Sequence, residues 1–377
     1  MDDSLKTILI NNLVNLRGPR TKRKIVVIES DDWGSIRMPD RGTYNYLLSK
    51  GVRVDKCPLT RNDSLASEED LSMLFEVLDS FRDKNGNSPV ITANCVVANP
   101  DFQKIRENDF RFYHYEIITE TFKKYPNHAN SFKIWMDGID RKIFFPQFHG
   151  REHLNVPKWM KALQLNMPET RLAFDNNLFG ISSTITSEKR SSYLAAFDTG
   201  ELNDFNEVFG ILRDGLSLFD KILGYPTKSF IAPNYIWPHE LEKELAVNDI
   251  RFIQGRRIQL DPRFQGAGYN RVAHYTGQKN EFGQIYTVRN CSFEPTIENK
   301  KDTVDSCLSE IRTAFMWGMP GIITSHRVNF IGAIDSTNRD RNLRLLDDLL
   351  SSITRLWPDV EYMTTADLGD LISENLR

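Results

Sequence analysis

The sequence predicts an α/β fold, a (β/α) barrel in a single domain over residues 1–377, and three observations lead to it. Short apolar runs alternate with longer segments of helical periodicity, which is typical of parallel βαβ units. Acidic and histidine side chains come directly after several of those runs, and the strand ends of a barrel open onto one face where such residues meet. No internal repeat, low-complexity tract or flexible linker divides the chain.

Strands are expected where short β-branched and apolar runs are bounded by turn residues. KIVVIE at 24–29 is the clearest example, because such a run ending at SDDWGS is typical of a strand buried on both faces. The other predicted strands are 88–100, which runs into a loop, 142–148, 229–233, 251–255, 320–326 and 360–365.

Helices are expected between these strands. Acidic residues open the helix at 66–83, Pro238 suits a helix start, and Gly224 suits a helix end. The predicted helices are 66–83, 156–163, 205–224, 238–247, 303–318, 339–357 and 366–376. Residues 100–141 and 256–301 break the alternation, so we treat them as insertions, the second irregular or a hairpin. Loops at the carboxyl face of a barrel set substrate choice, and we expect both insertions to lie there and narrow a groove.

Composition excludes several classes of protein. A 40% hydrophobic content over 377 residues supports a substantial core, and a net charge of −3 predicts no nucleic-acid partner. The basic clusters at 17–24 and 339–344 are interpreted as solvated faces. Four scattered cysteines without a CxxC pair argue against a structural zinc site or a disulfide-linked domain. The start lacks a secretory apolar core and no run approaches a membrane span, so we expect a cytoplasmic protein.

The segment FPQFHGREHLN at 145–155 contains the most informative pair of residues. His149 and His153 lie four residues apart behind a predicted strand, and a helical turn there would point both rings the same way. A hydrolytic metal ion takes about three protein ligands and keeps an open position. The alternative is an ordinary helix face with no metal.

The acidic pair in SDDWG at 30–34 supplies candidates for the third ligand. Successive side chains at a strand end diverge, so one of Asp31 and Asp32 can bind the metal while the other acts as general base. Alone, the pair is more typical of a turn or helix cap than of a metal site. His326 follows the apolar run GIITS and alone is more typical of a structural than of a catalytic histidine. The combination at three strand ends favours a metal-dependent active site.

HGREH also fits the H-x-x-E-H pattern of inverted zinc peptidases, in which Glu152 would be the base. That pattern belongs on a long helix, whereas Pro146 and Gly150 lie around and within this one. We keep it as a minor alternative.

With these motifs the chain resembles the polysaccharide deacetylase family, the family 4 carbohydrate esterases, whose fold is a distorted (β/α)7 barrel. The matching segments are VVIESDDWG, HGREH, IITSH and YMTTADLGDLI. The resemblance implies that Asp31 is the general base and His326 the general acid. It also implies that Asp32, His149 and His153 hold the metal, with zinc as the expected ion.

The chain also departs from the family pattern. The family's third motif places an Arg before a Pro to orient the base, but SFIAP has Ile231 and Ala232 there. Arg37 is the candidate substitute, and 252–257 the candidate region for the aromatic fourth motif.

The expected activity is removal of an N-acetyl or other acyl group from an amino sugar or polysaccharide. Trp33, Asn234 and Tyr235 are candidates for lining the groove, because aromatic faces suit sugar rings; simple packing at the barrel rim is the alternative. Two rival functions stay open. One is a barrel hydrolase of C–N bonds in a small or cyclic amide, and the other is a non-catalytic carbohydrate-binding relative.

Overall fold

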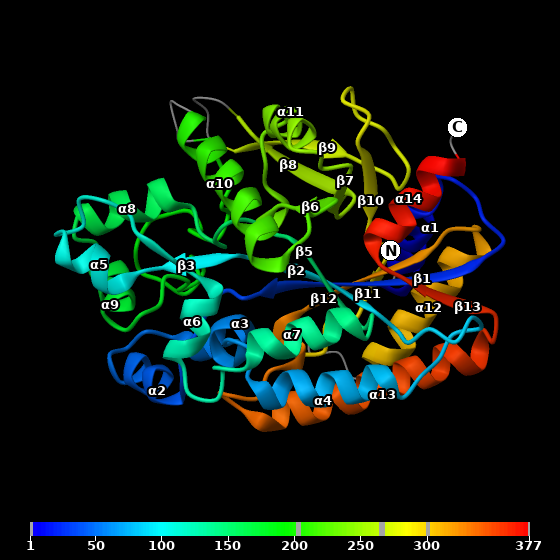
Figure 1. Cartoon of the computed structure of the whole chain (residues 1–377), viewed down its shortest axis with the longest axis horizontal. Helices are drawn as coiled ribbons and strands as arrows, with labels where there is room; N and C mark the ends of the chain where they lie inside the picture. The colour runs from blue at the N-terminus through cyan, green and yellow to red at the C-terminus, as the bar shows by residue number, and fades with distance from the viewer. Residues whose placement is uncertain (1–2, 201–204, 264–267, 299–301, 376–377) are drawn as a thin grey trace.

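The computed structural model describes residues 3–200, 205–263, 268–298 and 302–375, and a mostly parallel sheet runs through its centre (Figure 1). The strand order is β10-β7-β6-β5-β2-β1-β12-β11, with β13 beside the start of β1. The strands are β1 (Lys24–Trp33), β2 (Ile91–Cys95), β5 (Phe144–Phe148), β6 (Ser229–Ile231), β7 (Phe252–Gly255), β10 (Ile285–Val288), β11 (Cys291–Ser292), β12 (Gly321–His326) and β13 (Val360–Met363). The α/β prediction is confirmed.

The two ends of this strand path meet, which gives the sheet its barrel character. β10 and β11 are at opposite ends of the order, yet only Arg289 and Asn290 separate them along the chain. The end of β10 and the start of β11 therefore lie at most about 11 Å apart. The Arg289 amide donates to Gly255 of β7 and the Asn290 amide to Ile322 of β12. These two residues therefore join the first and last parts of the sheet.

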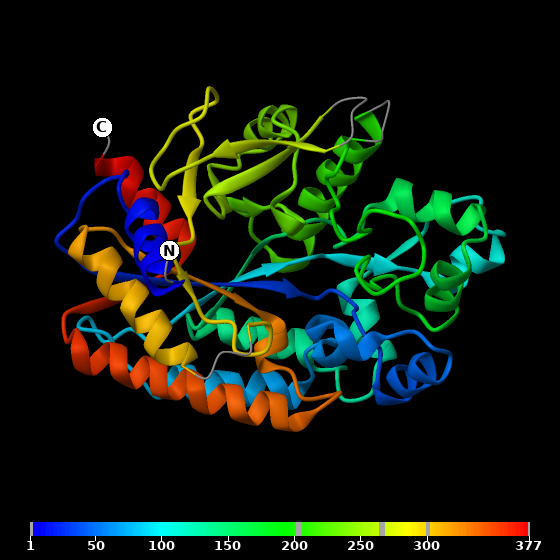
Figure 2. The ribbon, with the colours of Figure 1, turned by 180° about the vertical axis from the view of Figure 1, so that it is seen from behind.

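Helices lie on two opposite sides of the sheet. In Figure 1, α4, α7, α12 and α13 lie on one side and α10 and α11 on the other; Figure 2 shows the same layers from behind. The helices are α1 (Asp3–Val14), α2 (Arg41–Ser49), α3 (Pro58–Asn62), α4 (Glu68–Asp79), α5 (Phe102–Glu107), α6 (Ile118–Lys124), α7 (Ser131–Asp140), α8 (Val156–Gln164), α9 (Pro168–Asp175), α10 (Asn206–Leu223), α11 (Glu240–Val247), α12 (Thr303–Met316), α13 (Ser336–Leu356) and α14 (Thr365–Asn375).

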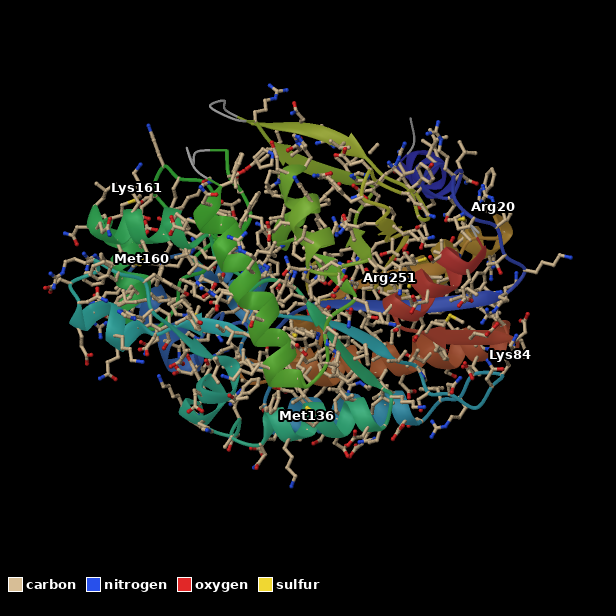
Figure 3. All side chains as sticks on the ribbon, turned by 45° about the horizontal axis from the view of Figure 1, so that its top comes forward. Arg20, Lys84, Met136, Met160, Lys161 and Arg251 are labelled. Atoms are coloured by element: carbon tan, nitrogen blue, oxygen red, sulfur yellow. The ribbon has the colours of Figure 1, made fainter. Side chains whose placement is uncertain are left out.

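Local sequence explains where several of these helices begin and end. Ser67 and Asp70 form a capping box at the start of α4. Gly224 ends α10 in the left-handed conformation, with φ 79°, which glycine adopts at little cost. Charged side chains such as Lys84, Lys161 and Arg251 are exposed at the surface (Figure 3). Among the residues described, no helix is both long and apolar enough to cross a bilayer.

The two predicted insertions differ from each other in structure. Residues 100–141 hold α5, α6, α7 and the short pair β3 (Ala98–Pro100) with β4 (Tyr115–Ile117). Residues 256–301 begin with the antiparallel hairpin of β8 (Ile258–Pro262) and β9 (Tyr269–Ala273). They then supply β10 and β11 of the main sheet, so the second half of this segment belongs to the barrel and is not an insertion. Residues 264–267 and 299–301 lie outside the described part.

Candidate metal centre and active site

The end of β1 separates the two carboxylates of the acidic pair. The β1–β2 register slips between Ser30 and Trp33, so β1 carries one extra residue there, as in a β-bulge. Asp32 has φ 76°, a conformation that non-glycine residues seldom adopt. Bulge and positive φ together direct the Asp31 and Asp32 side chains to different partners.

The two histidines come from the loop after β5. Residues 151–154 form a bend and α8 begins only at Val156, so the predicted helical turn between His149 and His153 is absent. Gly150 has φ 124°, and a Cβ there would lie 2.9 Å from the Glu152 carbonyl oxygen. Glycine therefore allows the tight chain path that brings the rings together, with centroids 4.9 Å apart.

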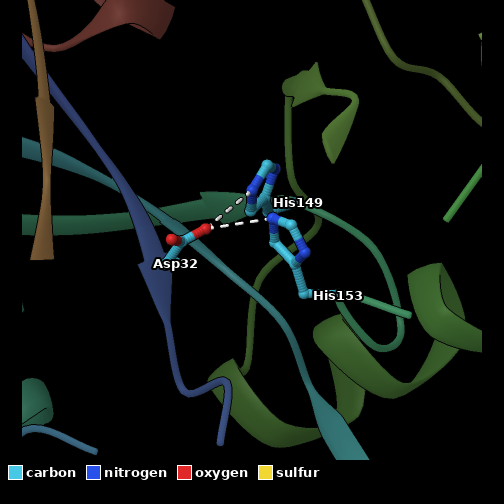
Figure 4. A group of neighbouring side chains, drawn as sticks. All are labelled: Asp32, His149 and His153. Atoms are coloured by element: carbon cyan, nitrogen blue, oxygen red, sulfur yellow. Dashed lines mark ion pairs between the residues drawn. The ribbon is translucent and has the colours of Figure 1, made fainter. Parts of the chain in front are cut away.

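Asp32, His149 and His153 converge (Figure 4). Asp32 Oδ1 lies 3.0 Å from His153 Nε2 and 3.5 Å from His149 Nε2, and all three side chains are buried. One ligand atom from each residue falls within 4.8 Å of the others. The three residues that the sequence proposed as metal ligands thus form one group.

The protonation pattern of this group fits a cation. His149 Nδ1 lies 2.9 Å from the Ile231 carbonyl oxygen, so Nδ1 is the donor and Nε2 faces Asp32. Burial lowers the pKa of His153 to about 4, and the ring is neutral at pH 7. Burial opposes ionisation of Asp32, but Arg37 and His153 hold its pKa well below the usual value. Two imidazoles and a carboxylate match a His₂Asp site for a divalent ion.

Asp31 has a set of partners separate from those of Asp32. Arg289 donates to both of its oxygens, at 2.7 and 2.6 Å, and Asn94 donates to Oδ1 at 2.8 Å. Arg289 also bonds Glu29 at 2.6 Å and the Tyr235 hydroxyl at 3.0 Å. Burial alone would raise the pKa of Asp31, but the charge and hydrogen bonds of Arg289 lower it below its usual range. Asp31 is therefore a fixed, ionised carboxylate.

His326 lies at the end of β12, directly opposite Asp31 in the β1–β12 register. Its Nε2 is 3.8 Å from Asp31 Oδ2, and its Nδ1 is 2.5 Å from Glu294 Oε1. Burial would lower the pKa of His326, but Glu294 and then Asp31 raise it to about 10. The imidazole is therefore protonated at neutral pH and keeps 19% of its side chain exposed.

Arg289 and Glu294 were missed in the sequence. Both lie in 256–301, which was treated as an insertion, although IYTVRN places a charged residue directly after a short apolar run. Arg37 does not orient the base as suggested, because its Nη2 contacts Asp32 Oδ2 at 3.0 Å. Within the predicted fourth-motif region, Gln254 exchanges two amide hydrogen bonds with Asn94 and so supports Asp31 indirectly.

The three groove candidates have different surroundings. Trp33 is 1% exposed and packs edge-on against Phe144 in the core. It therefore offers no face to a sugar, and its surroundings match the alternative of simple packing. Asn234 is exposed and Tyr235 half-buried, and both have positive φ, 59° and 58°. Such consecutive positions concentrate at functional sites.

Glu152 does not occupy the position of a peptidase base. Its Oε1 accepts from Arg151 Nε at 2.7 Å and from the Tyr113 hydroxyl at 2.9 Å. It is buried and is not part of the three-ligand group. The long helix that the H-x-x-E-H pattern needs is also absent from residues 149–155.

Comparisons with known proteins add a likeness of fold. No protein-family model and no curated protein matches the chain. Similar solved structures include a putative polysaccharide deacetylase from Mycobacterium smegmatis, with 10% identity, 95% of this chain and 93% of that chain covered, and a TM-score of 0.47. A putative glycoside hydrolase/deacetylase from Parabacteroides distasonis has 11% identity, coverages of 94% and 72%, and a TM-score of 0.47. The Puue allantoinase has 7% identity, with 94% of this chain and 93% of that chain covered, and a TM-score of 0.45. With TM-scores below 0.5, these likenesses assign no activity to this chain.

Proposed function

We propose that this protein is a metal-dependent hydrolase that removes an acyl group from an amino sugar or its polymer. The acyl group that we propose is N-acetyl. Asp32, His149 and His153 are the ligands. A divalent ion bound there, with zinc as the expected metal, would polarise the substrate carbonyl, promote ionisation of the attacking water and stabilise the developing oxyanion.

One observation carries the proposal: an ionised carboxylate and a protonated imidazole lie side by side next to the ligand group. Asp31 is the residue before ligand Asp32, and His326 Nε2 lies 3.8 Å from Asp31 Oδ2. Hydrolysis of an amide needs a base for the attacking water and an acid for the departing nitrogen. The lowered pKa of Asp31 keeps it ionised and the raised pKa of His326 keeps it protonated at neutral pH, so each group is in the state that its proposed role needs.

The proton path follows from these roles. Asp31 accepts a proton from the attacking water, and Arg289 keeps its carboxylate in one orientation. His326 donates its proton to the nitrogen that leaves, while Glu294 holds the ring through Nδ1 and leaves Nε2 for the substrate. The Tyr235 hydroxyl contacts Arg289 beside this space, and we propose that Tyr235 and its neighbour Asn234 contact the sugar.

A substrate screen tests the function. Purified protein loaded with Zn²⁺ is incubated with N-acetylglucosamine, its oligomers and a set of cyclic amides, and released acetate or ring-opened product is measured. We expect acetate release that is lost after chelation and restored by Zn²⁺, with Asp31→Asn as the inactive control. Ring opening without acetate release would favour the small-amide hydrolase, and no turnover by any metal-loaded form would favour a binding protein.

A further inference from the structure

The two oxygens of Asp32 have different neighbours. Oδ1 faces His149 and His153, whereas Oδ2 accepts a hydrogen bond from Arg37 Nη2 at 3.0 Å. Arg37 is buried, with 5% exposure. A ligand carboxylate in this site therefore has one oxygen free for the ion and one already bonded to a cation.

Arg37 is kept in place by a second buried carboxylate. Its Nε lies 3.6 Å from Asp63 Oδ2, and Asp63 also receives two hydrogen bonds from Arg327, at 3.0 and 2.9 Å. Arg327 in turn donates to the Ser35 carbonyl at 2.7 Å. Because Arg327 is the residue after His326, this network connects the metal ligand with the strand end that presents the acid.

The partner of this ligand carboxylate is a charged donor. An ionised carboxylate can only accept hydrogen bonds, so its second oxygen needs a donor. A ligating histidine is oriented by an acceptor, such as a carboxylate, a carbonyl or a water, which increases the basicity of the ligand. A guanidinium on a ligand carboxylate has the opposite effect, since it draws negative charge away from the oxygen that faces the ion. The guanidinium also places a positive charge near the divalent cation, with only the Asp32 carboxylate between them.

We propose that Arg37 is a positioning residue that makes Asp32 a one-oxygen ligand, and that its charge weakens ion binding while strengthening the ion's pull on the substrate. This inference rests on the proposed metal-dependent function. Arg37 then lowers the affinity of the site for the metal and increases the polarisation of the substrate by the ion. Removal of Arg37 should therefore strengthen metal binding and slow the reaction.

Two effects of removing Arg37 compete, and their sizes decide the direction. Loss of a partner that orients a metal ligand typically weakens metal binding by ~10–100-fold. Relief of repulsion acts the other way: at an effective dielectric of ~20, even two unit charges a few ångströms apart change an equilibrium by about 10²-fold or more. Since the ion carries two charges, the electrostatic gain outweighs the orientational loss.

The experiment compares Zn²⁺ affinity, measured by competition with a chromophoric chelator, in wild type, Arg37→Gln and Arg37→Lys. Gln is polar but neutral, whereas Lys keeps the positive charge without the forked pair of donors. Arg339→Gln is the matched control, because Arg339 is also buried and pairs with buried Asp70 at 3.0 Å. Arg37→Met serves as a second neutral variant if Arg37→Gln does not fold by circular dichroism.

We expect the neutral variant to bind Zn²⁺ at least ~10-fold more tightly than wild type and to show a lower kcat. Arg37→Lys should bind no more tightly than wild type, and Arg339→Gln should match wild type. Equal or weaker Zn²⁺ binding by the neutral variant, or tighter binding with undiminished kcat, would overturn the inference. A wild-type protein that binds no Zn²⁺ would instead refute the proposed function, and the two failures are thus distinguishable.

Discussion

Arg289 contacts both oxygens of Asp31, at 2.7 and 2.6 Å, from the two-residue link between β10 and β11. The residue that holds the proposed base thus lies where the barrel closes. A bidentate guanidinium–carboxylate pair fixes orientation as well as charge. The pair also explains how Asp31 stays ionised although it is buried.

Replacement of Arg289 should impair turnover without removing the metal. Arg289→Met frees Asp31 to rotate, and we expect kcat to fall by ~10²-fold or more, as for a misplaced general base. Arg289→Lys keeps the positive charge but cannot bind both carboxylate oxygens at once as the guanidinium does. Its kcat should therefore lie between those of Arg289→Met and wild type. Steady-state kinetics together with metal content check this, and loss of the metal in Arg289→Lys would contradict the assignment.

The two neighbouring carboxylates should separate by role. Asp31→Asn should retain the metal and lose turnover by ~10²–10⁴-fold, because an amide cannot accept the water proton. Asp32→Asn should instead weaken metal binding. Metal content and kcat are measured on the same preparations, and deacylation that survives Asp31→Asn would refute the mechanism.

His326→Ala should distinguish between leaving groups. An amine leaves poorly without a proton, so an N-acetyl substrate should react ~10²–10⁴-fold more slowly. An activated aryl ester needs little protonation and should be affected much less. Equal losses on the two substrates would show that His326 is not the acid.

Glu294 should set the alkaline limit of activity. His326, with its pKa raised to about 10, stays protonated up to that pH, and Glu294→Gln should move the alkaline limb of the kcat profile down by at least about one pH unit. The raised folded-state pKa also contributes stability that is full below ~6.5 and is lost as pH rises to about 10. The difference in Tm between wild type and Glu294→Gln should shrink over that range, and an unmoved alkaline limb would refute the pairing.

The sequence predicted the parts of the fold that depend on local pattern. Strands such as 24–29 and 320–326 are apolar runs, and the helix at 205–224 ends at a glycine, so periodicity and capping chemistry suffice to locate them. β10 and β11 were not predicted, because four- and two-residue strands within a polar segment carry almost no periodic signal. They form strands because neighbouring β7 and β12 supply their pairing partners.

The candidate site was predictable where spacing along the chain carries the chemistry, as for Asp31–Asp32 and His149–His153. Arg289 and Glu294 lie 258 and 32 residues from the groups they bind. Barrel closure brings Arg289 to Asp31, and the pairing of β11 with β12 brings Glu294 to His326. Trp33 shows the converse, since an aromatic residue beside the site is directed into the core by the bulge that separates the carboxylates. Neither relationship is encoded by local pattern.

Metal analysis of the purified protein tests the central claim most directly. We predict about one divalent ion per chain in wild type by mass spectrometry, its loss in His149→Ala and in His153→Ala, and its retention in the Arg339→Gln control. In a structure of the loaded protein, Asp32 Oδ1 and both Nε2 atoms should lie ~2.0–2.2 Å from one ion. A wild-type protein that takes up no ion when offered Zn²⁺, or an ion that persists when both histidines are replaced, would contradict it.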